Sequence, residues 1–191
     1  MNRNSSNKQE RMRRLKSFYN MVPNLFWSVV CLVPIFIFHY RFIELKLLYF
    51  FIAASTLSIF LPNSFFNKIQ LSKTVTFYKK LGVERVNRFT QNGEIINVIM
   101  RKQFPHLKLV AQKRRVVKSL LKQTYYYERF HFLIFTFFIL TTVYAISTHY
   151  FGWSFILLVT NLIYNVFPNL LQQYLRVRLM QFKRGFKSKY I

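Results

Sequence analysis

Four apolar runs along the chain are long enough, or nearly long enough, to cross a membrane. Residues 21–40, 130–148 and 151–171 contain no Lys, Arg, Asp or Glu, and a helix needs roughly 20 apolar residues to span a bilayer. The remaining run, residues 47–61, reaches that length only if its helix begins near Phe42. The pattern predicts an all-α membrane protein with four transmembrane helices, arranged as two hairpins with a basic amphipathic cytoplasmic segment between them.

These runs divide the chain into five segments. The prediction is a basic cytoplasmic tail at 1–20, a first transmembrane hairpin at 21–61, a basic cytoplasmic interfacial segment at 62–129, a second transmembrane hairpin at 130–171, and a basic cytoplasmic tail at 172–191. We expect the first twenty residues to be flexible. The first run is predicted to be a retained anchor, because no small-residue cleavage site follows it.

The distribution of positive charge predicts the orientation. The chain has 29 Lys and Arg against 5 acidic residues, for a net charge of +24. Residues 1–24 carry 6 of these cations, residues 62–129 carry 15 and residues 172–191 carry 6, whereas the connection at 41–46 carries two and that at 149–150 none. Since positive residues gather on the cytoplasmic side, both termini and the central segment are predicted to face the cytoplasm of a multi-pass cell-membrane protein.

The central segment has helical character of its own. Apolar residues at 63–81 follow helical spacing, and Gly82 is placed to end that helix. Residues 91–93 form a turn signal, Gln-Asn-Gly. After Pro105, apolar and basic positions predict an amphipathic helix that lies on anionic phospholipid and continues into the third span.

Composition excludes several classes of protein. Apolar residues make up 52% of the chain and aromatic residues 19%, which is unlike a disordered chain or a soluble nucleic-acid binder. Cys31 is the single cysteine, and the chain contains no aspartate, so a disulfide framework, a multi-cysteine metal site and most Asp-based metal motifs are excluded. We expect no metal site and no nucleic-acid partner.

Polar side chains on the fourth span form one stripe. Its members are separated by four, four, three and four residues, and they are Asn161, Asn165, Asn169, Gln172 and Arg176. Polar groups inside a bilayer cost free energy and therefore often mark functional sites. The alternative is that these amides only form hydrogen bonds between packed helices.

A second polar feature opens the third span. Glu128 and His131 are three residues apart and so face the same way on a helix. They reach the same depth as the inner end of the polar stripe, and a carboxylate beside an imidazole is the usual arrangement for a general base. In the alternative interpretation, Glu128 pairs with Arg129 or another cation, and His131 bonds a neighbouring helix.

These residues resemble a known family, the glycosyl-4,4'-diaponeurosporenoate acyltransferases, which finish staphyloxanthin-type carotenoids. Residues 128–132 are similar to the family's Glu-x-x-His-Trp motif, Asn165-Val166 to its Asn-x-Pro, and residues 172–179 to its Gln-Arg-Tyr-Asn-Arg-x-Arg-Leu. The resemblance covers roughly residues 61–179. Departures such as Gln173 and Leu175 indicate a distant member.

The resemblance implies transfer of a fatty acyl group onto a hydroxyl of a membrane glycolipid or glycosylated carotenoid at the cytoplasmic face. His131 would take the hydroxyl proton, and Glu128 would hold the imidazole and stabilise its charged form. These two residues are therefore the expected catalytic pair.

The resemblance also implies a substrate-binding set. Asn165 or Gln172 would donate to the developing oxyanion, and Arg176 and Arg178 would hold phosphates of the acyl donor. Tyr174, between Gln172 and Arg176, belongs to the same motif. The expected donor is acyl-CoA or an acyl-carrier protein, and no bound cofactor is required.

A non-enzymatic alternative explains the same charge pattern. A small membrane module that binds anionic lipid, or that scaffolds a partner membrane complex, would use the basic segment as a lipid contact and the polar stripe as packing. An anion-conducting pore is disfavoured, because the outer connections carry few cations. The sequence is compatible with a homo-oligomer in each case.

Overall fold

The computed structural model describes residues 3–88, 94–104 and 114–188, and these residues form helices joined by short connections. The helices, in chain order, are α1 (Arg3–Phe42), α2 (Leu45–Thr56), the 3₁₀-helix η1 (Leu57–Phe60), α3 (Asn63–Lys68), α4 (Val75–Lys80), α5 (Val83–Asn87), α6 (Glu94–Gln103), α7 (Arg114–Ser147), α8 (Phe151–Asn161), the π-helix η2 (Leu162–Val166) and α9 (Phe167–Ser188).

Three helical stretches are long and apolar enough to cross a membrane. They are Glu10–Phe42 in α1, Val117–Ser147 in α7, and Phe151–Phe182 in the continuous run of α8, η2 and α9. The fourth apolar helix, Leu45–Phe60, is shorter. The prediction of an all-helical protein with membrane-length helices is therefore confirmed for the part of the chain that the structure describes.

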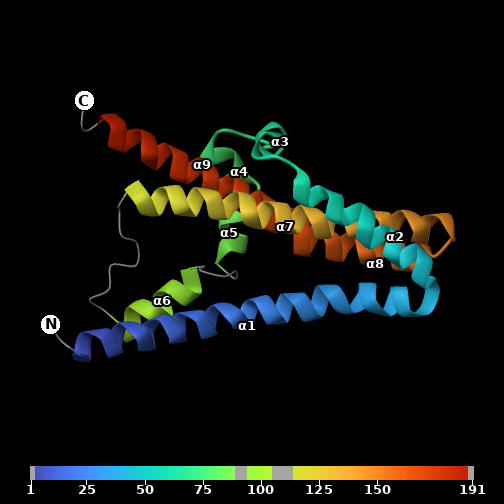
Figure 1. Ribbon diagram of the computed structural model, residues 1–191, viewed down its shortest axis with the longest axis horizontal. Helices are drawn as coiled ribbons and strands as arrows, with labels where there is room; N and C mark the ends of the chain where they lie inside the picture. Colours follow the sequence, from blue (N-terminus) through green and yellow to red (C-terminus); the bar gives the residue numbers. More distant parts are fainter. Residues whose placement is uncertain (1–2, 89–93, 105–113, 189–191) are drawn as a thin grey trace.

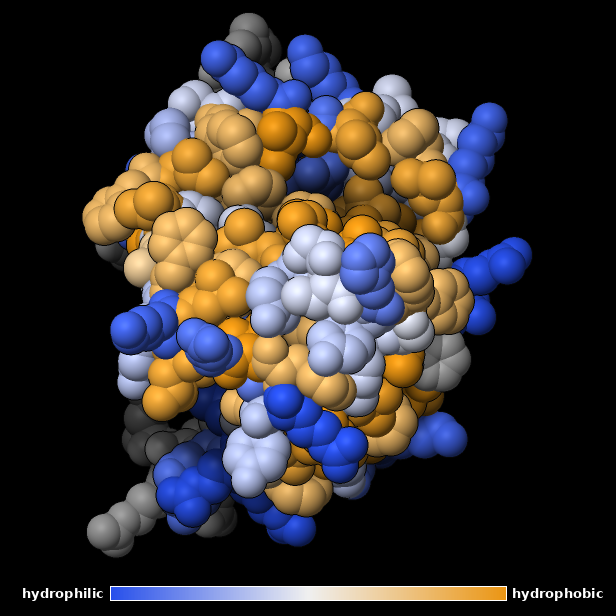
Figure 2. All heavy atoms as spheres, turned by 90° about the vertical axis from the view of Figure 1, so that its right-hand side faces the viewer, coloured by the Kyte–Doolittle hydropathy of each residue, from blue (hydrophilic) through white to orange (hydrophobic). Residues whose placement is uncertain are grey.

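The long helices lie side by side, and their connections gather at one end (Figure 1). The link from α1 to α2 and the link from α7 to α8 both lie at the right-hand end, whereas the two termini lie at the left; α6 lies beside the N-terminal part of α1, and α3 to α5 lie closer to the middle. Viewed from the end with the two links, the molecule shows many apolar side chains, with several strongly hydrophilic residues among them and others at the margins (Figure 2).

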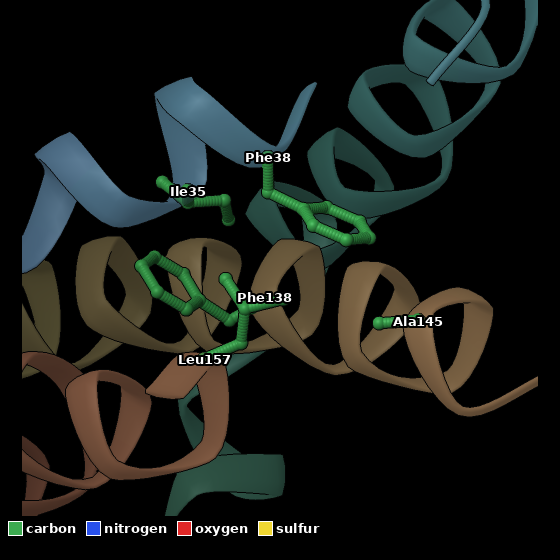
Figure 3. Close-up of a cluster of buried hydrophobic side chains, with 5 residues drawn as sticks. All are labelled: Ile35, Phe38, Phe138, Ala145 and Leu157. Atoms are coloured by element: carbon green, nitrogen blue, oxygen red, sulfur yellow. The ribbon is translucent and has the colours of Figure 1, made fainter. Parts of the chain in front are cut away.

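A cluster of buried apolar side chains joins three of the long helices near the linked end (Figure 3). Ile35 and Phe38 come from α1, Phe138 and Ala145 from α7, and Leu157 from α8. The cluster is tightened by the Tyr144 hydroxyl, which donates to the Phe42 carbonyl at 3.1 Å. This end of α1 is thereby fixed against α7 and α8.

Two smaller clusters hold the short helices. Tyr78 of α4 and Val83 of α5 pack against the α9 side chains Leu171, Tyr174 and Val177. On the opposite side of Figure 1, Ile96, Met100 and Phe104 of the α6 region pack against the N-terminal half of α1. The segment between α2 and α7 is thus packed onto the ends of two long helices.

The segment from 63 to 81 is not one helix, as its periodicity predicts, but two. Residues 69–74 interrupt it between α3 and α4, because side chains from elsewhere bind this stretch: the Leu71 amide donates to Gln173 Oε1 at 3.2 Å, and the Ser72 amide donates to the Tyr78 hydroxyl at 3.1 Å. Gly82 does follow α4 in the left-handed conformation (φ 76°), as expected for a residue that ends a helix.

Two further expectations concern the ends of the spans. The first twenty residues are not separate from the first span, because α1 is helical from Arg3 onward. The basic helix expected after Pro105 lies partly outside the described residues, as does the turn at 91–93, but from Arg114 the chain runs into the third span without a break, as predicted.

Candidate active site

Glu128 lies in a buried hydrogen-bond network between α7 and α9. Its exposed fraction is 1%, and that of Arg176 is 0%. The Arg176 guanidinium forms an ion pair with Glu128 Oε2, and Gln173 Nε2 donates to Glu128 Oε1 at 3.0 Å. Both carboxylate oxygens are therefore occupied by groups of α9.

Arg176 carries this network into the segment after the second apolar helix. Its Nε donates to Gln70 Oε1 at 2.9 Å, and a terminal nitrogen donates to the Phe66 carbonyl at 3.3 Å. The guanidinium also lies over the Tyr125 ring, 4.4 Å from its centroid, in a favourable cation–π position. A planar group with five donors suits such a multiple anchor.

The same segment is bound at further points. Gln173 Oε1 accepts from the Leu71 amide at 3.2 Å and lies 3.1 Å from the Tyr78 hydroxyl. Arg129 donates to the Leu61 carbonyl at 3.0 Å and to Asn63 Oδ1 at 3.1 Å. Residues 61–72 are thus fastened onto α7 and α9 by side chains of both helices.

The expected pair of Glu128 and His131 is not formed in the described structure. Glu128 binds Arg176 and Gln173 instead, as the alternative interpretation with another cation predicts. Arg176 is enclosed in this network, so it is not available to a phosphate in this conformation. The i, i+3 spacing correctly predicts that Glu128 and His131 lie one turn apart on the same helix. It does not predict the partner of Glu128, because a carboxylate pairs with whichever cation packs against it.

His131 lies within the membrane-length part of α7, one turn beyond Glu128. Its Nδ1 atom is buried and has no hydrogen-bond partner among the described residues. The polar groups beside the imidazole are the Asn165 side chain and the Tyr164 backbone, and the Tyr164 ring meets it edge-on at 6.0 Å. His131 and Asn165, two predicted site residues, are therefore brought together.

A short hydrogen-bond chain leads to Asn165 from within the bundle. Asn161 Nδ2 donates to the Phe135 carbonyl of α7 at 3.4 Å, and Asn165 Nδ2 donates to Asn161 Oδ1 at 2.8 Å. Asn165 Oδ1 is buried and unpartnered among the described residues, as is Asn169 Oδ1. Part of the polar stripe serves as interhelical packing, and part of it presents free acceptors.

The π-helix η2 holds Tyr164 and Asn165, and its position follows from the sequence. Pro168 lies four residues after Tyr164, so an α-helix would set its ring against the Tyr164 carbonyl and would offer that carbonyl no N–H. The wider turn at Leu162–Val166 avoids this conflict, with the Phe167 amide bonded to the Leu162 carbonyl. Single π-turns of this kind are frequent at functional sites.

Tyr164, which lies beside His131, and its contact Ser28 were not predicted from the sequence. The Tyr164 hydroxyl lies 2.9 Å from Ser28 Oγ, 136 residues away on α1. A signal was present for each, since both are polar positions inside apolar runs, but neither shares a recognisable motif. The contact makes α1 a part of the site's surroundings.

The remaining predicted residues are divided between core and surface. Tyr174 is buried in the cluster that packs α4 and α5 onto α9. Gln172 is half-buried, and it is the neighbouring Gln173 that reaches Glu128. Arg178 is exposed. Within the described residues, no three His, Cys, Asp or Glu side chains form a group suited to a metal ion.

The described chain is thus a helical protein with membrane-length spans and a histidine beside buried, unpartnered polar atoms, features that define an integral membrane protein with a polar site between its helices. The family model for glycosyl-4,4'-diaponeurosporenoate acyltransferase matches residues 62–184, well over half of the chain, and the protein belongs to this family. The family and the apolar helices together support a membrane acyltransferase. Comparison with curated proteins finds no match, and comparison with solved structures finds none.

Proposed function

We propose that the protein transfers a fatty acyl group from a thioester donor onto a hydroxyl of a membrane glycolipid or glycosylated carotenoid at the cytoplasmic face of the cell membrane. The observation that supports this most directly is His131, which lies inside a family-matched span beside polar atoms without a partner among the described residues. Unpartnered buried polar atoms cost free energy, so their retention beside a histidine supports a functional role for this site rather than packing alone.

The proposed reaction is an acyl exchange between sulfur and oxygen. The acceptor hydroxyl gives its proton to His131 while its oxygen attacks the thioester carbonyl carbon. The C–S bond of the resulting tetrahedral intermediate then breaks, and the thiolate takes up the proton from the imidazolium. The products are the ester and the free thiol of the donor, and a positioned base of this kind contributes about 10²–10⁴-fold in rate.

The other predicted residues have different parts in this proposal. Asn165 gives one of its two amide N–H groups to Asn161, so the oxyanion donor in this proposal is either Gln172 or the second N–H of Asn165. In this proposal Glu128 and Arg176 hold residues 61–72 against α7 and α9 and do not act on the substrate. Exposed Arg178 is the proposed contact for the phosphates of acyl-CoA or an acyl-carrier protein.

The proposed topology has four crossings as two hairpins, with both termini inside. It is supported by the gathering of the α1–α2 and α7–α8 links at one end (Figure 1) and by the scarcity of Lys and Arg in those links. The short stretch Leu45–Phe60 would then cross only with local thinning of the bilayer. In this arrangement the basic segment at 62–129 contacts anionic phospholipid.

The test is comparative lipid mass spectrometry of host cells that carry or lack the gene. Cells that lack it should accumulate a lipid lighter by one acyl chain, and the wild-type gene should restore the heavier species. The His131→Ala variant should reach the membrane at the normal level without restoring it. The matched control is His149→Asn, which changes a histidine at the other end of α7 to a residue that tolerates its positive φ of 62°.

Two outcomes would contradict the proposal. A lipidome unchanged by loss of the gene would favour a non-enzymatic membrane module. Full restoration by His131→Ala would show that acyl transfer, if present, uses another base.

A further inference from the structure

The buried Nδ1 of His131 and the buried Oδ1 of Asn165 are complementary. Both lack a hydrogen-bond partner among the described residues, and the Asn165 side chain lies beside the imidazole. A ring nitrogen can carry a proton and donate it, whereas an amide oxygen can only accept. Hydrogen bonds in substrate-free sites are often long or misaligned and tighten when substrate binds, so these two atoms are a natural donor and acceptor.

The orientation of the Asn165 amide is determined by the residues behind it. The Phe135 carbonyl can only accept, so Asn161 must turn its Nδ2 toward it and its Oδ1 away. That Oδ1 can also only accept, so Asn165 must turn its own Nδ2 toward Asn161. Asn165 is therefore left with its oxygen free, and the direction of the chain from Phe135 does not depend on how either amide is assigned.

The backbone beside His131 has the same polarity. The Tyr164 carbonyl has no α-helical donor, because residue 168, four positions on, is Pro168. The Tyr164 backbone is the other polar neighbour of the imidazole. The π-turn thus offers the imidazole acceptors rather than donors.

We infer that Asn165, oriented by Asn161, is the positioning residue for His131: it accepts the Nδ1–H and leaves Nε2 unprotonated. The inference rests on the proposed function, in which His131 is the general base. Nδ1 is buried, which leaves Nε2 as the nitrogen to take the proton of an acceptor hydroxyl, and only the Nδ1–H tautomer has Nε2 unprotonated. Asn165 thereby has the orienting part that the sequence pattern assigns to Glu128.

The tautomer can be measured without any substrate. The full-length protein, labelled with ¹⁵N in its four histidines and placed in lipid nanodiscs, would be examined by ¹⁵N NMR, and the His131 signals assigned by their loss in His131→Gln. The expected result is a protonated, pyrrole-type Nδ1 and an unprotonated, pyridine-type Nε2. A protonated Nε2 with an unprotonated Nδ1 would overturn the inference.

Variants of Asn161 test the hydrogen-bond chain from Asn161 through Asn165 to His131 (the relay) without changing the histidine. Asn161→Leu removes the acceptor that turns Asn165, so the Nδ1–H preference should be lost and kcat should fall at least about 10-fold, within the range of a general base, with KM little changed. Asn161→Asp keeps that acceptor and should retain the tautomer. Thr160→Val is the matched control, since Thr160 bonds only its own helix at Ile156 and Leu157, and it should behave as the wild type.

The results separate this inference from the proposed function. An unchanged Nδ1–H signal in folded Asn161→Leu would overturn the relay even if acyl transfer is confirmed. The predicted tautomer in the wild type and Asn161→Asp, together with its loss in Asn161→Leu, would support the relay even if the lipid experiment finds no acyl transfer.

Discussion

Glu128 of α7 and Arg176 of α9 form a buried ion pair that also fastens the segment after the second apolar helix. The pair has exposed fractions of 1% and 0%, and Arg176 extends it to Gln70 and to the Phe66 carbonyl. A buried pair gains little over apolar packing, but the loss of one partner leaves an uncompensated charge. Substitution of either Glu128 or Arg176 alone is therefore expected to be strongly destabilising.

Removal of one member of this pair should destabilise the protein strongly. Arg176→Leu or Glu128→Leu should each cost about 3–5 kcal/mol of unfolding free energy, and the double variant should cost less than their sum. Reversible unfolding in detergent micelles measures this. The exposed pair of Glu10 and Arg14 is the control, where Glu10→Gln should cost about 0.5 kcal/mol or less; equal costs at both pairs would contradict the argument.

Arg178 should behave in the opposite way to Arg176. Its side chain is exposed, so Arg178→Gln should change the unfolding free energy by no more than about 0.5 kcal/mol. If Arg178 binds donor phosphates, the same variant should raise the KM for the acyl donor about 10-fold, the equivalent of one charge-assisted hydrogen bond, and leave kcat nearly unchanged. Titrations of the acyl donor with membranes that carry Arg178→Gln or Arg176→Leu distinguish an effect on donor binding from an effect on folding. An unaltered KM would remove Arg178 from the site.

Tyr78 should make stability fall at alkaline pH. Burial raises the pKa of the Tyr78 hydroxyl above its ordinary value near 10, although its bond to Ser72 and the charge of Arg176 act in the other direction. The unfolded chain then loses this proton before the folded protein does, so the contribution is complete below pH 10 and declines as pH rises through the folded pKa. Melting temperatures between pH 8 and 11 should decline less for Tyr78→Phe than for the wild type. Tyr126→Phe, at an exposed position, should decline as the wild type does.

The contact between Ser28 and Tyr164 should couple α1 to the π-turn. Their hydroxyl oxygens are 2.9 Å apart, and interhelical hydrogen bonds in membranes contribute about 0.6 kcal/mol on average in double-mutant cycles. Ser28→Ala, Tyr164→Phe and the double variant, unfolded in bicelles, should give a coupling energy of that size. A coupling near zero would mean that the two hydroxyls only lie close together.

Much of the fold can be predicted from the sequence, because an apolar run of membrane length has few alternatives to forming a helix. The positions of Glu128, His131 and Asn165 at neighbouring depths follow from the same counting. Their partners do not, since Glu128 pairs with Arg176 through the packing of α7 on α9. Spacing along one helix cannot show which cation of another helix packs beside a carboxylate.

The details around His131 depend on one local departure from helical geometry. A regular period places Gln172 on the polar stripe, whereas the structure uses Gln173 for the contact with Glu128. The free oxygen of Asn165 likewise depends on the order of donors and acceptors from Phe135 onward. The direction of these hydrogen bonds is determined only when α7, α8 and η2 are packed together.

Pro168 should favour activity at the cost of stability. Its ring and its missing N–H conflict with the Tyr164 carbonyl in a regular helix, and the π-turn at Leu162–Val166 is where the chain resolves that conflict. Pro168→Ala removes the conflict, so an α-helix can replace the π-turn. The residues before it would then rotate relative to α9, and Asn161 and Asn165 would lose their alignment with Phe135 and His131.

The expected result is a variant that is as stable as the wild type or more stable, by up to the roughly 3 kcal/mol that an interior proline costs a helix, yet transfers acyl groups at least about 10-fold more slowly. Unfolding in bicelles and the lipid assay in cells measure the two effects. Pro23→Ala is the control, because Pro23 also lies inside a long helix, α1, but has no part in the proposed site. Loss of both stability and activity in Pro168→Ala would indicate that the proline is needed for folding, whereas normal activity would show that the π-turn does not position His131.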